Sequence, residues 1–371
     1  MNEKVIYKIK DSIDLFITDE KFLTVYFMNT RIRKSFKINS YMINLLECLD
    51  GRKTLGELER IMFEKYMVKQ EVTEYIISLL LKNRIITPLN PRVDILNLED
   101  CERYQRQINY WTEILDSEEA GIRAQKKIVD SNVIIFGCGA IGGNIALELA
   151  MAGVGRMTLF DYDKVEKSDV ARHMYYNCAN IHRSKTDSLK EELLLVNPDI
   201  EIVCINETLH PHASIENLIK EFDFVVNSLD EPYIGYTSAK ISRICVKYNI
   251  PHYIAGGFDA HLASTGELIV PFVTPCVECY ATHFKRALAN WKPEKHPVRE
   301  RDYEIGGLAS MSLFSASYAC ITILKYIIGI VPKQDEYQVR GEMLFNTMQL
   351  NYLDIKKNDK CPVCGKEAVK Q

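Results

Sequence analysis

Residues 131–154 read SNVIIFGCGAIGGNIALELAMAGV and decide the fold. An apolar, β-branched run precedes Gly137, Gly139 and Gly142, and an apolar helical pattern follows them. Glycines permit a tight turn and a close approach of the backbone to a ligand, and the N-terminus of the following helix favours phosphate anions. The order of strand, glycine turn and helix therefore predicts a nucleotide-binding unit.

The residues after the glycine turn suggest which nucleotide binds. Asp161 ends the next strand pattern, RMTLFDYD, where a carboxylate can accept hydrogen bonds from ribose hydroxyl groups. Arg172 and Lys185 follow, and two cations suit a triphosphate better than the pyrophosphate of a dinucleotide. The alternatives are a glycine turn without a ligand and two surface charges in solvent.

Strands and helices alternate beyond the turn. The patterns predict strands at 156–163, 200–206, 222–230 and 251–257, separated by helices at 185–198, 215–222 and 237–249. This alternation predicts an α/β fold with a Rossmann-like, mostly parallel sheet covered by helices on both faces.

The first 90 residues have a different pattern. Short strands are expected at 15–19 and 22–28, and helices at 41–51, 54–66 and 72–86, with Thr54 as an N-cap. We expect residues 1–90 to form a small α+β domain like a winged helix, without the basic composition of a DNA-reading wing. Residues 91–102 are the expected linker, and residues 103–371 the expected nucleotide-binding domain.

Composition limits the function classes. The chain has 371 residues, of which 47% are hydrophobic and 26% charged, so a largely disordered chain is excluded. The formal net charge of −4 argues against nucleic acid as the main partner. No signal peptide or membrane-spanning run is evident, which predicts a cytoplasmic protein without a membrane partner.

Two pairs of cysteines have the spacing of metal ligands. Cys276 and Cys279 form one C-x-x-C unit, and Cys361 and Cys364 form a second, closed by a glycine. Four thiolates from two such turns supply the tetrahedral sulfur set that structural zinc prefers. A redox pair or a coincidence is the alternative interpretation.

The order of these segments resembles the ThiF/MoeB/ubiquitin-activating adenylation family over about residues 101–365. The landmarks are RYQRQI at 103–108, GCGAIGG at 137–143, AGVGRMTLFDYDKVEKSDVAR at 152–172, Lys185, VNPDI at 196–200, SLD at 228–230 and the cysteine pairs. The resemblance implies a homodimer that binds ATP with Mg²⁺ and forms an acyl-adenylate with release of pyrophosphate.

The resemblance also implies roles for individual residues. Asp161 would hold the ribose, Arg172 and Lys185 the phosphates, and Asp230 the Mg²⁺. Arg106 would reach the ATP of the partner subunit. The expected nucleotide contacts are Gly137, Gly139, Ala140, Gly142, Asp161, Asp163, Ser168, Asp169, Arg172, Lys185 and Asp230; the expected catalytic residues are Arg106, Arg172, Lys185 and Asp230.

Two departures from the family pattern affect the chemistry. The usual S-N-L-x-R-Q segment reads SDVARH at 168–173, so Asp169 replaces an amide that faces the phosphates. A carboxylate there repels a triphosphate unless it meets Mg²⁺ or a cation. Cys320 is the only cysteine between the two cysteine pairs, and its apolar helical context predicts a buried thiol, which disfavours a thioester relay.

The front segment resembles the PqqD-like peptide-recognition domain, which binds a leader peptide as an added strand; we expect 22–29 to be the edge strand. The whole chain is similar to the microcin C and pantocin maturation enzymes, which implies ATP-dependent modification of a ribosomally made precursor peptide. The alternatives are adenylation of the C-terminal glycine of a ubiquitin-like sulfur carrier, and a leader-binding scaffold without catalysis. The front domain could also serve only in dimerisation or DNA binding.

Overall fold

The computed structural model describes residues 2–18, 21–89, 95–231, 233–259, 262–292, 294, 306–331 and 340–365. The chain divides into two compact units, Met1–Lys126 and Lys127–Gln371. This division falls later than the linker expected at 91–102, of which residues 91–94 lie outside the described residues. Each unit is described by itself.

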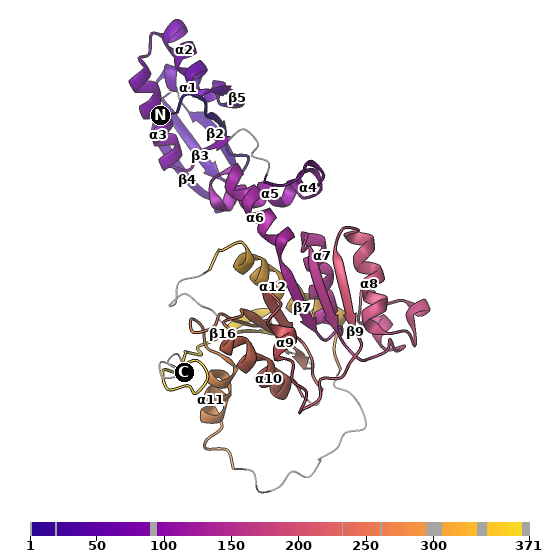
Figure 1. Cartoon of the computed structure of the whole chain (residues 1–371). Helices are drawn as coiled ribbons and strands as arrows, with labels where there is room; N and C mark the ends of the chain where they lie inside the picture. The colour runs from indigo at the N-terminus through magenta and orange to yellow at the C-terminus, as the bar shows by residue number, and fades with distance from the viewer. Residues whose placement is uncertain are drawn as a thin grey trace. The chain divides into compact units, whose positions relative to one another are not determined.

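The first unit contains two small antiparallel sheets. One has the order β5 (Asp50–Thr54), β1 (Ile6–Ile9), β6 (Ile86–Leu89); the other has the order β2 (Ile13–Thr18), β3 (Phe22–Phe27), β4 (Ile32–Lys37). The strands expected at 15–19 and 22–28 therefore belong to a three-stranded meander (Figure 1). The strand expected at the edge, residues 22–29, is β3, which pairs on both sides, so that prediction was wrong. The edges of this sheet are β2 and β4.

Helices of the first unit follow the sequence pattern closely. They are α1 (Ser40–Cys48), α2 (Leu55–Tyr66), α3 (Gln70–Lys82), α4 (Leu98–Arg103), α5 (Gln105–Leu115) and α6 (Glu118–Asp130), the last of which continues into the second unit. Thr54 caps α2 as predicted: its side chain accepts from the Glu57 N–H, and Glu57 accepts from the Thr54 N–H. Apolar side chains of α1, α2 and α3, including Leu45, Leu58 and Ile77, form the core with β2 and β3.

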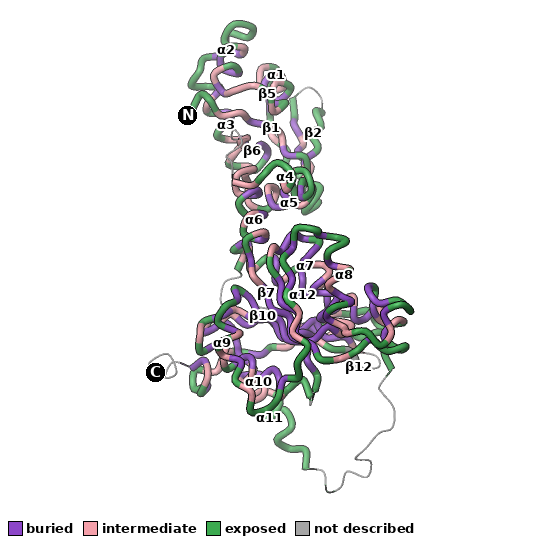
Figure 2. The backbone as a smooth tube through the Cα atoms, turned by 45° about the vertical axis from the view of Figure 1, so that its right-hand side comes forward, coloured by how far each residue is buried: buried purple, intermediate pink, exposed green. Residues whose placement is uncertain are grey.

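The second unit is built on a six-stranded sheet. Its order is β14 (Gly266–Ile269), β11 (His252–Ala255), β10 (Phe224–Asn227), β7 (Asn132–Phe136), β8 (Arg156–Phe160), β9 (Glu201–Ile205). Every pair is parallel except β11 with β14, which confirms the mostly parallel sheet expected from the alternation. The central strands are buried along their length (Figure 2) because helices cover them on both faces.

The helices of the second unit form two groups. α7 (Gly142–Ala152) packs against α8 (Lys185–Val196) and α12 (Ala309–Ile327), whereas α10 (Ile234–Lys247) packs against α9 (Glu216–Ile219) and α11 (Val277–Ala287). The chain runs from β7 outward to β9 and then returns to β10 on the other side of β7. Right-handed crossovers in these two directions place the groups on opposite faces. The strand order reverses between β7 and β10, where such sheets bind ligands.

A smaller sheet completes the second unit. Its order is β12 (Phe258–Asp259), β13 (Leu262–Ser264), β15 (Arg340–Leu344), β16 (Gln349–Leu353), all antiparallel. Two 3₁₀ turns, Asp169–Ala171 and Cys178–Asn180, lie between β8 and α8. In the described part of the chain, no helix has the length and apolarity needed to cross a membrane.

Candidate active site

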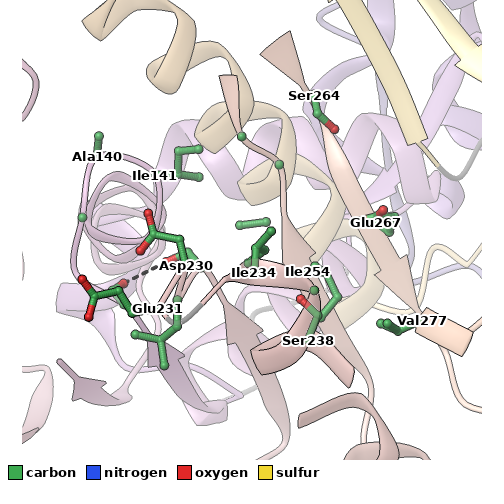
Figure 3. A pocket seen from close by; sticks show the side chains of 18 of the residues that line it. Ala140, Ile141, Asp230, Glu231, Ile234, Ser238, Ile254, Ser264, Glu267 and Val277 are labelled. Carbon is green, nitrogen blue, oxygen red and sulfur yellow. Dashed lines mark hydrogen bonds between the residues drawn. The ribbon is translucent and has the colours of Figure 1, made fainter. Parts of the chain in front are cut away.

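A cavity of about 880 Å³ lies at the carboxyl ends of the parallel strands, around the point where the strand order reverses. The structure brings these predicted site residues to its wall: Gly137, Gly139, Ala140, Asp161, Asp163, Asp169, Arg172, Lys185 and Asp230. Figure 3 shows Ala140, Asp230 and Glu231 at one end of the cavity and Ser264, Glu267 and Val277 at the other. The wall therefore unites segments that are far apart in the sequence.

The glycine turn lies between β7 and α7, as the sequence predicts. Gly137 has φ +92°, a left-handed conformation that disfavours side chains. A Cβ atom on Gly142 would lie 2.1 Å from the Gly137 carbonyl oxygen and 2.2 Å from the Ser228 hydroxyl, so Gly142 closes the turn against β10. A Cβ on Gly139 would meet no atom within 4 Å. Within this turn, Gly139 is therefore the glycine with open space for a ligand.

Two tyrosines support this turn, and no sequence motif pointed to them. The Tyr175 hydroxyl donates to the Gly139 carbonyl at 2.7 Å, and the Tyr176 hydroxyl lies 3.1 Å from the Cys138 carbonyl and 3.0 Å from that of Lys185. Both side chains are buried. They connect the turn to the start of α8, and so to Lys185.

Asp161 lies at the end of β8 and is 5% exposed. Its Oδ2 accepts the Cys138 N–H at 2.6 Å, and its Oδ1 accepts the Asp163 N–H at 2.8 Å. Burial raises the pKa of Asp161, although these two hydrogen bonds oppose the shift. Each carboxylate oxygen has a second lone pair, so Asp161 can hold the turn and still accept from a ligand hydroxyl.

The Asp169 carboxylate lies close to two cations, which offset the repulsion that its negative charge would exert on a triphosphate. It is 3% exposed, and its Oδ1 lies 3.3 Å from Arg172 Nη2, while its Oδ2 lies 3.8 Å from Lys185 Nζ. Lys185 also donates to Asp163 at 3.0 Å. Burial lowers the pKa of Lys185, but the carboxylates of Asp163, Asp169 and Asp161 outweigh it and raise the pKa, so the ammonium is retained. Arg172 and Lys185 are thus held by carboxylates beside the turn.

His173 lies on the same wall. Its Nδ1 is 2.7 Å from the Asp169 carbonyl oxygen, which can only accept, so Nδ1 carries the hydrogen. Its Nε2 is buried and has no hydrogen-bond partner among the described residues. Burial lowers the pKa of His173, which keeps the ring neutral near pH 7. The ring packs against Tyr175 and Tyr176, with centroids 5.4 and 5.0 Å away.

Acidic side chains lie at the end of β10. Asp230 lines the cavity and is exposed, with no ion pair or hydrogen bond among the residues that the structure describes. The adjacent Glu231 accepts a hydrogen bond from Tyr162, and that bond raises the pKa of the Tyr162 hydroxyl. An exposed carboxylate on the wall of the same cavity as Arg172 and Lys185 is able to ligate Mg²⁺ together with phosphate oxygens and water.

Three predicted residues are not on the cavity wall. Gly142 lies behind the turn, where its role is close packing. Ser168 is exposed and makes no cap hydrogen bond to the following 3₁₀ turn. Arg106 is exposed near the start of α5, in the first compact unit.

The four paired cysteines converge, although 85 residues separate the partners of each close contact. Cys276 and Cys361 have their sulfurs 3.6 Å apart, Cys279 and Cys364 3.5 Å, and all four lie within 4.8 Å of one another. Sulfurs bound tetrahedrally at about 2.3 Å from Zn²⁺ lie about 3.8 Å apart, so this buried set fits zinc. The set leaves no ligand position for catalysis. It connects the start of α11 to the C-terminal segment.

Cys320 is buried in α12, as the sequence predicts. The residue is 3% exposed, and burial raises the pKa of its thiol well above the ordinary value. A reactive thiol needs exposure and a lowered pKa. Cys320 therefore lacks the environment of a thioester-forming nucleophile.

The opposite end of the cavity contains a charged pair that sequence reasoning missed. Glu267 on β14 accepts from Arg340 Nη1 at 3.0 Å, and both line the cavity. Tyr280 from α11 lies on the same wall. No spacing pattern in the sequence connects β14 with β15, so the ion pair between Glu267 and Arg340 could be recognised only in the three-dimensional structure.

Comparisons with known proteins agree with this geometry. The ThiF family model matches residues 104–364. The sulfur carrier protein ThiS adenylyltransferase of Escherichia coli K12 is 28% identical over 275 residues, covering 73% of this chain and 97% of that protein. The vegetative HesA protein of Trichormus variabilis is 30% identical over 280 residues, covering 73% and 91%.

Two solved structures share the fold over nearly the whole chain. One is E. coli MccB with MccA-N7isoASN, with TM-score 0.71, 19% identity and coverage of 97% of this chain and 99% of that chain. The other is PaaA, with TM-score 0.71, 21% identity and coverage of 94% and 100%. The shared fold thus extends N-terminal to the family match, over most of the first compact unit.

Proposed function

This chain belongs to the ThiF family and is an ATP-dependent adenylating enzyme, and from that premise we propose that it activates a ribosomally made precursor peptide in antibiotic biosynthesis. The activated group is a carboxylate or amide of the peptide, which then cyclises, dehydrates or receives a nucleotide. The observation that carries the proposal is the first unit, most of which precedes the family match and which has an unpaired β-strand edge among its described residues.

The edge of β4 suits a peptide. β4 pairs only with β3 among the described strands, so its other side presents backbone N–H and C=O groups. An extended peptide can add there as a strand, where main-chain hydrogen bonds supply affinity. Arg33, Lys34 and Lys37 are exposed along β4, which favours an acidic leader segment. This edge replaces the one expected at residues 22–29.

The other compact unit supplies the adenylation chemistry. Gly139 leaves space for phosphates, Asp161 accepts from the ribose, and Arg172 and Lys185 exchange part of their contact with Asp169 and Asp163 for phosphate oxygens. The peptide carboxylate oxygen forms a bond to the α-phosphorus while the bond to the bridging oxygen breaks and pyrophosphate leaves. Mg²⁺ on Asp230 would neutralise charge on the leaving group. The work of the protein is largely positioning and charge stabilisation.

Homodimerisation and zinc are further parts of the proposal. The resemblance assigns Arg106 to the ATP site of a partner subunit. Arg106 is exposed on α5, which supports a contact with another subunit. The convergence of four buried thiols supports a structural Zn²⁺. We expect the enzyme to work in the cytoplasm, where its precursor is made.

A sulfur-carrier substrate is the second candidate, because the ThiS adenylyltransferase matches this chain over 97% of its own length. In that case the activated group would be the C-terminal glycine of a ubiquitin-like protein. The first unit counts against it, because most of that unit lies outside the family match. A leader-binding scaffold without catalysis does not agree with membership of an adenylating family.

Pyrophosphate release tests the proposal. The purified full chain is incubated with ATP and Mg²⁺, with and without the short peptide encoded beside its gene, and the peptide is then weighed by mass spectrometry. Hydroxylamine is added in parallel, because it traps an acyl-adenylate as a hydroxamate. We expect peptide-dependent pyrophosphate and a changed peptide mass.

Controls separate the candidates. Release with a Gly-Gly-ended carrier protein but not with the peptide would replace the proposal with the second candidate. Asp230→Ala should abolish pyrophosphate release yet leave peptide affinity unchanged, whereas Glu207→Ala, an exposed acid outside the cavity, should retain both. Arg33→Glu with Lys34→Glu should weaken peptide binding, and Lys65→Glu with Lys69→Glu, at two exposed cations outside β4, is the matched double charge reversal.

A further inference from the structure

The tip of the glycine turn presents backbone donors to the cavity. Gly139, Ala140 and Ile141 line the cavity just before α7 begins at Gly142 (Figure 3). None of their three N–H groups forms a hydrogen bond within the part of the chain that the structure describes. A backbone N–H is a strong donor, and near the N-terminus of a helix it favours an anion. The direction in which these groups point therefore matters for a phosphate.

The carbonyl groups of the same peptide units face two tyrosines. The Gly139 carbonyl accepts from the Tyr175 hydroxyl at 2.7 Å, and the Cys138 carbonyl lies 3.1 Å from the Tyr176 hydroxyl. In a planar trans peptide unit, the N–H and the C=O point in opposite directions. Because both carbonyls face buried tyrosine side chains, the N–H groups of Gly139 and Ala140 face the cavity.

Gly143, in the first turn of α7, leaves the space that Tyr175 occupies. A Cβ atom on Gly143 would lie 2.0 Å from the Tyr175 hydroxyl oxygen and 2.3 Å from Cζ of the ring. Gly143 is not among the glycines with a positive φ, so space and not backbone conformation requires glycine here. Its N–H also donates to the Gly139 carbonyl, at 2.9 Å. Gly143 and Tyr175 thus hold the same carbonyl from two sides.

Both tyrosines are fixed as hydrogen-bond donors. Tyr175 is 2% exposed and Tyr176 4%, and their ring centroids lie 4.5 Å apart. Burial raises the pKa of each hydroxyl well above its ordinary value, so both keep their protons near neutral pH. In a close-packed interior, neither ring can turn away without disturbing the other.

We propose that Tyr175 and Tyr176 are positioning residues that hold the N–H groups of Gly139 and Ala140 as fixed donors to the phosphates of ATP. A peptide unit beside a glycine rotates at little cost, and rotation would bring a carbonyl oxygen toward the phosphate oxygens and repel them. The two hydroxyls oppose this rotation, because it would break their hydrogen bonds. Neither tyrosine is among the described residues that line the cavity, so each acts through the turn.

Isothermal titration calorimetry with the purified full chain tests the proposal by comparing ATP with adenosine, which differ only in the phosphates. We expect Tyr175→Phe to raise the dissociation constant for ATP about fivefold and to leave that for adenosine unchanged, because Asp161 still holds the ribose. Tyr176→Phe is the second variant, with the same expected result. Tyr318→Phe is the matched control. It removes a hydroxyl that bonds to Tyr352 at 2.9 Å outside the cavity, and it should change neither constant.

Gly143→Ala tests the same contact from the other side. Its methyl group displaces the Tyr175 ring, so we expect ATP to bind at least about fivefold more weakly. Adding Tyr175→Phe should then have little further effect, because the hydrogen bond is already lost.

An unchanged dissociation constant for ATP in either tyrosine variant, with an unchanged thermal midpoint, would overturn the role of that tyrosine. Equal losses of affinity for ATP and adenosine would overturn both roles, because they would indicate a general effect on the fold. These titrations omit the second reactant, so their outcome is independent of whether that reactant is a precursor peptide.

Discussion

Gly139 and Gly142 lie in the same turn but have different surroundings. The space at Gly139 is open, whereas a Cβ on Gly142 would collide with the Gly137 carbonyl and the Ser228 hydroxyl. We expect Gly139→Ala to retain the thermal midpoint within a few degrees and to raise the KM for ATP about tenfold or more, because the methyl group occupies ligand space.

Gly142→Ala provides the contrast. Backbone atoms must move to admit the methyl group, so we expect a loss of about 2–4 kcal/mol in the free energy of unfolding. Thermal denaturation and ATP titration of both variants check this pair. Equal destabilisation by the two changes would contradict the assignment of Gly139 to ligand contact.

Asp169 places an internal negative charge against the two cations that we propose bind the phosphates. Its carboxylate lies 3.3 Å from Arg172 and 3.8 Å from Lys185, and a triphosphate must compete with it. We expect Asp169→Asn to lower the KM for ATP several-fold, because asparagine still accepts from the Glu166 N–H but no longer holds the cations by charge. Initial-rate kinetics at fixed free Mg²⁺ measure the effect. A raised KM would show that Asp169 aids binding by orienting the cations.

The packing of β11 against α10 includes a titratable group. His252 is fully buried, and its Nε2 lies 2.8 Å from the Ser242 hydroxyl. Burial lowers the pKa of His252 from 6.5 to about 4. Between these values the unfolded chain binds a proton that the folded chain does not, so the free energy of unfolding falls as pH falls from about 6.5 to 4.

The expected loss across that window is about 3 kcal/mol from this residue. His252→Gln should flatten the dependence, because glutamine can still bond to Ser242 without titrating. Urea unfolding at pH 7, 6 and 5 measures the slope, with His212→Gln on the surface as the control. An unchanged slope in His252→Gln would show that other groups cause the acid sensitivity.

The segment after β16 is connected to α11 by the four cysteines. Without a metal, four neighbouring thiols contribute little to holding two segments together, so we expect the C-terminal segment to depend on a bound Zn²⁺. We expect the full chain to contain one Zn²⁺ per subunit by elemental analysis. Cys361→Ser should lose most of the metal and make the segment sensitive to proteolysis, whereas Cys178→Ser, an exposed cysteine outside the set, should lose neither.

At the scale of the whole molecule, the proposed homodimer makes each site depend on two chains. If Arg106 acts on the partner's ATP, Arg106→Ala and Asp230→Ala are each inactive alone. A mixture that exchanges subunits forms hybrids in which one site has both residues. We therefore expect mixing to restore about a quarter of wild-type pyrophosphate release. Persistent inactivity, with hybrid dimers verified by mass, would place Arg106 outside the partner's site.

The family and much of the site were predictable because the motifs that indicate them lie within short stretches of sequence. The glycine turn, Asp161 at the end of β8 and the alternation of strands and helices each follow from short-range patterns. Thr54 capped α2 as expected for the same reason. The cysteine spacing predicted that two pairs would meet, because a zinc site needs four ligands regardless of their separation in the chain.

The sequence by itself therefore determined the class of fold, the residues gathered at the glycine-turn end of the cavity and the four cysteines that converge. Only the tertiary structure showed that β4, and not β3, is an edge of its sheet. A strand is an edge when no strand pairs with one of its sides, and its own pattern of apolar and polar residues does not show this. It also decided that Asp169 meets two cations and that Glu267 pairs with Arg340, 73 residues away. Charges so far apart in the chain become neighbours only when the sheet order is fixed, since pairing across strands carries no local signal.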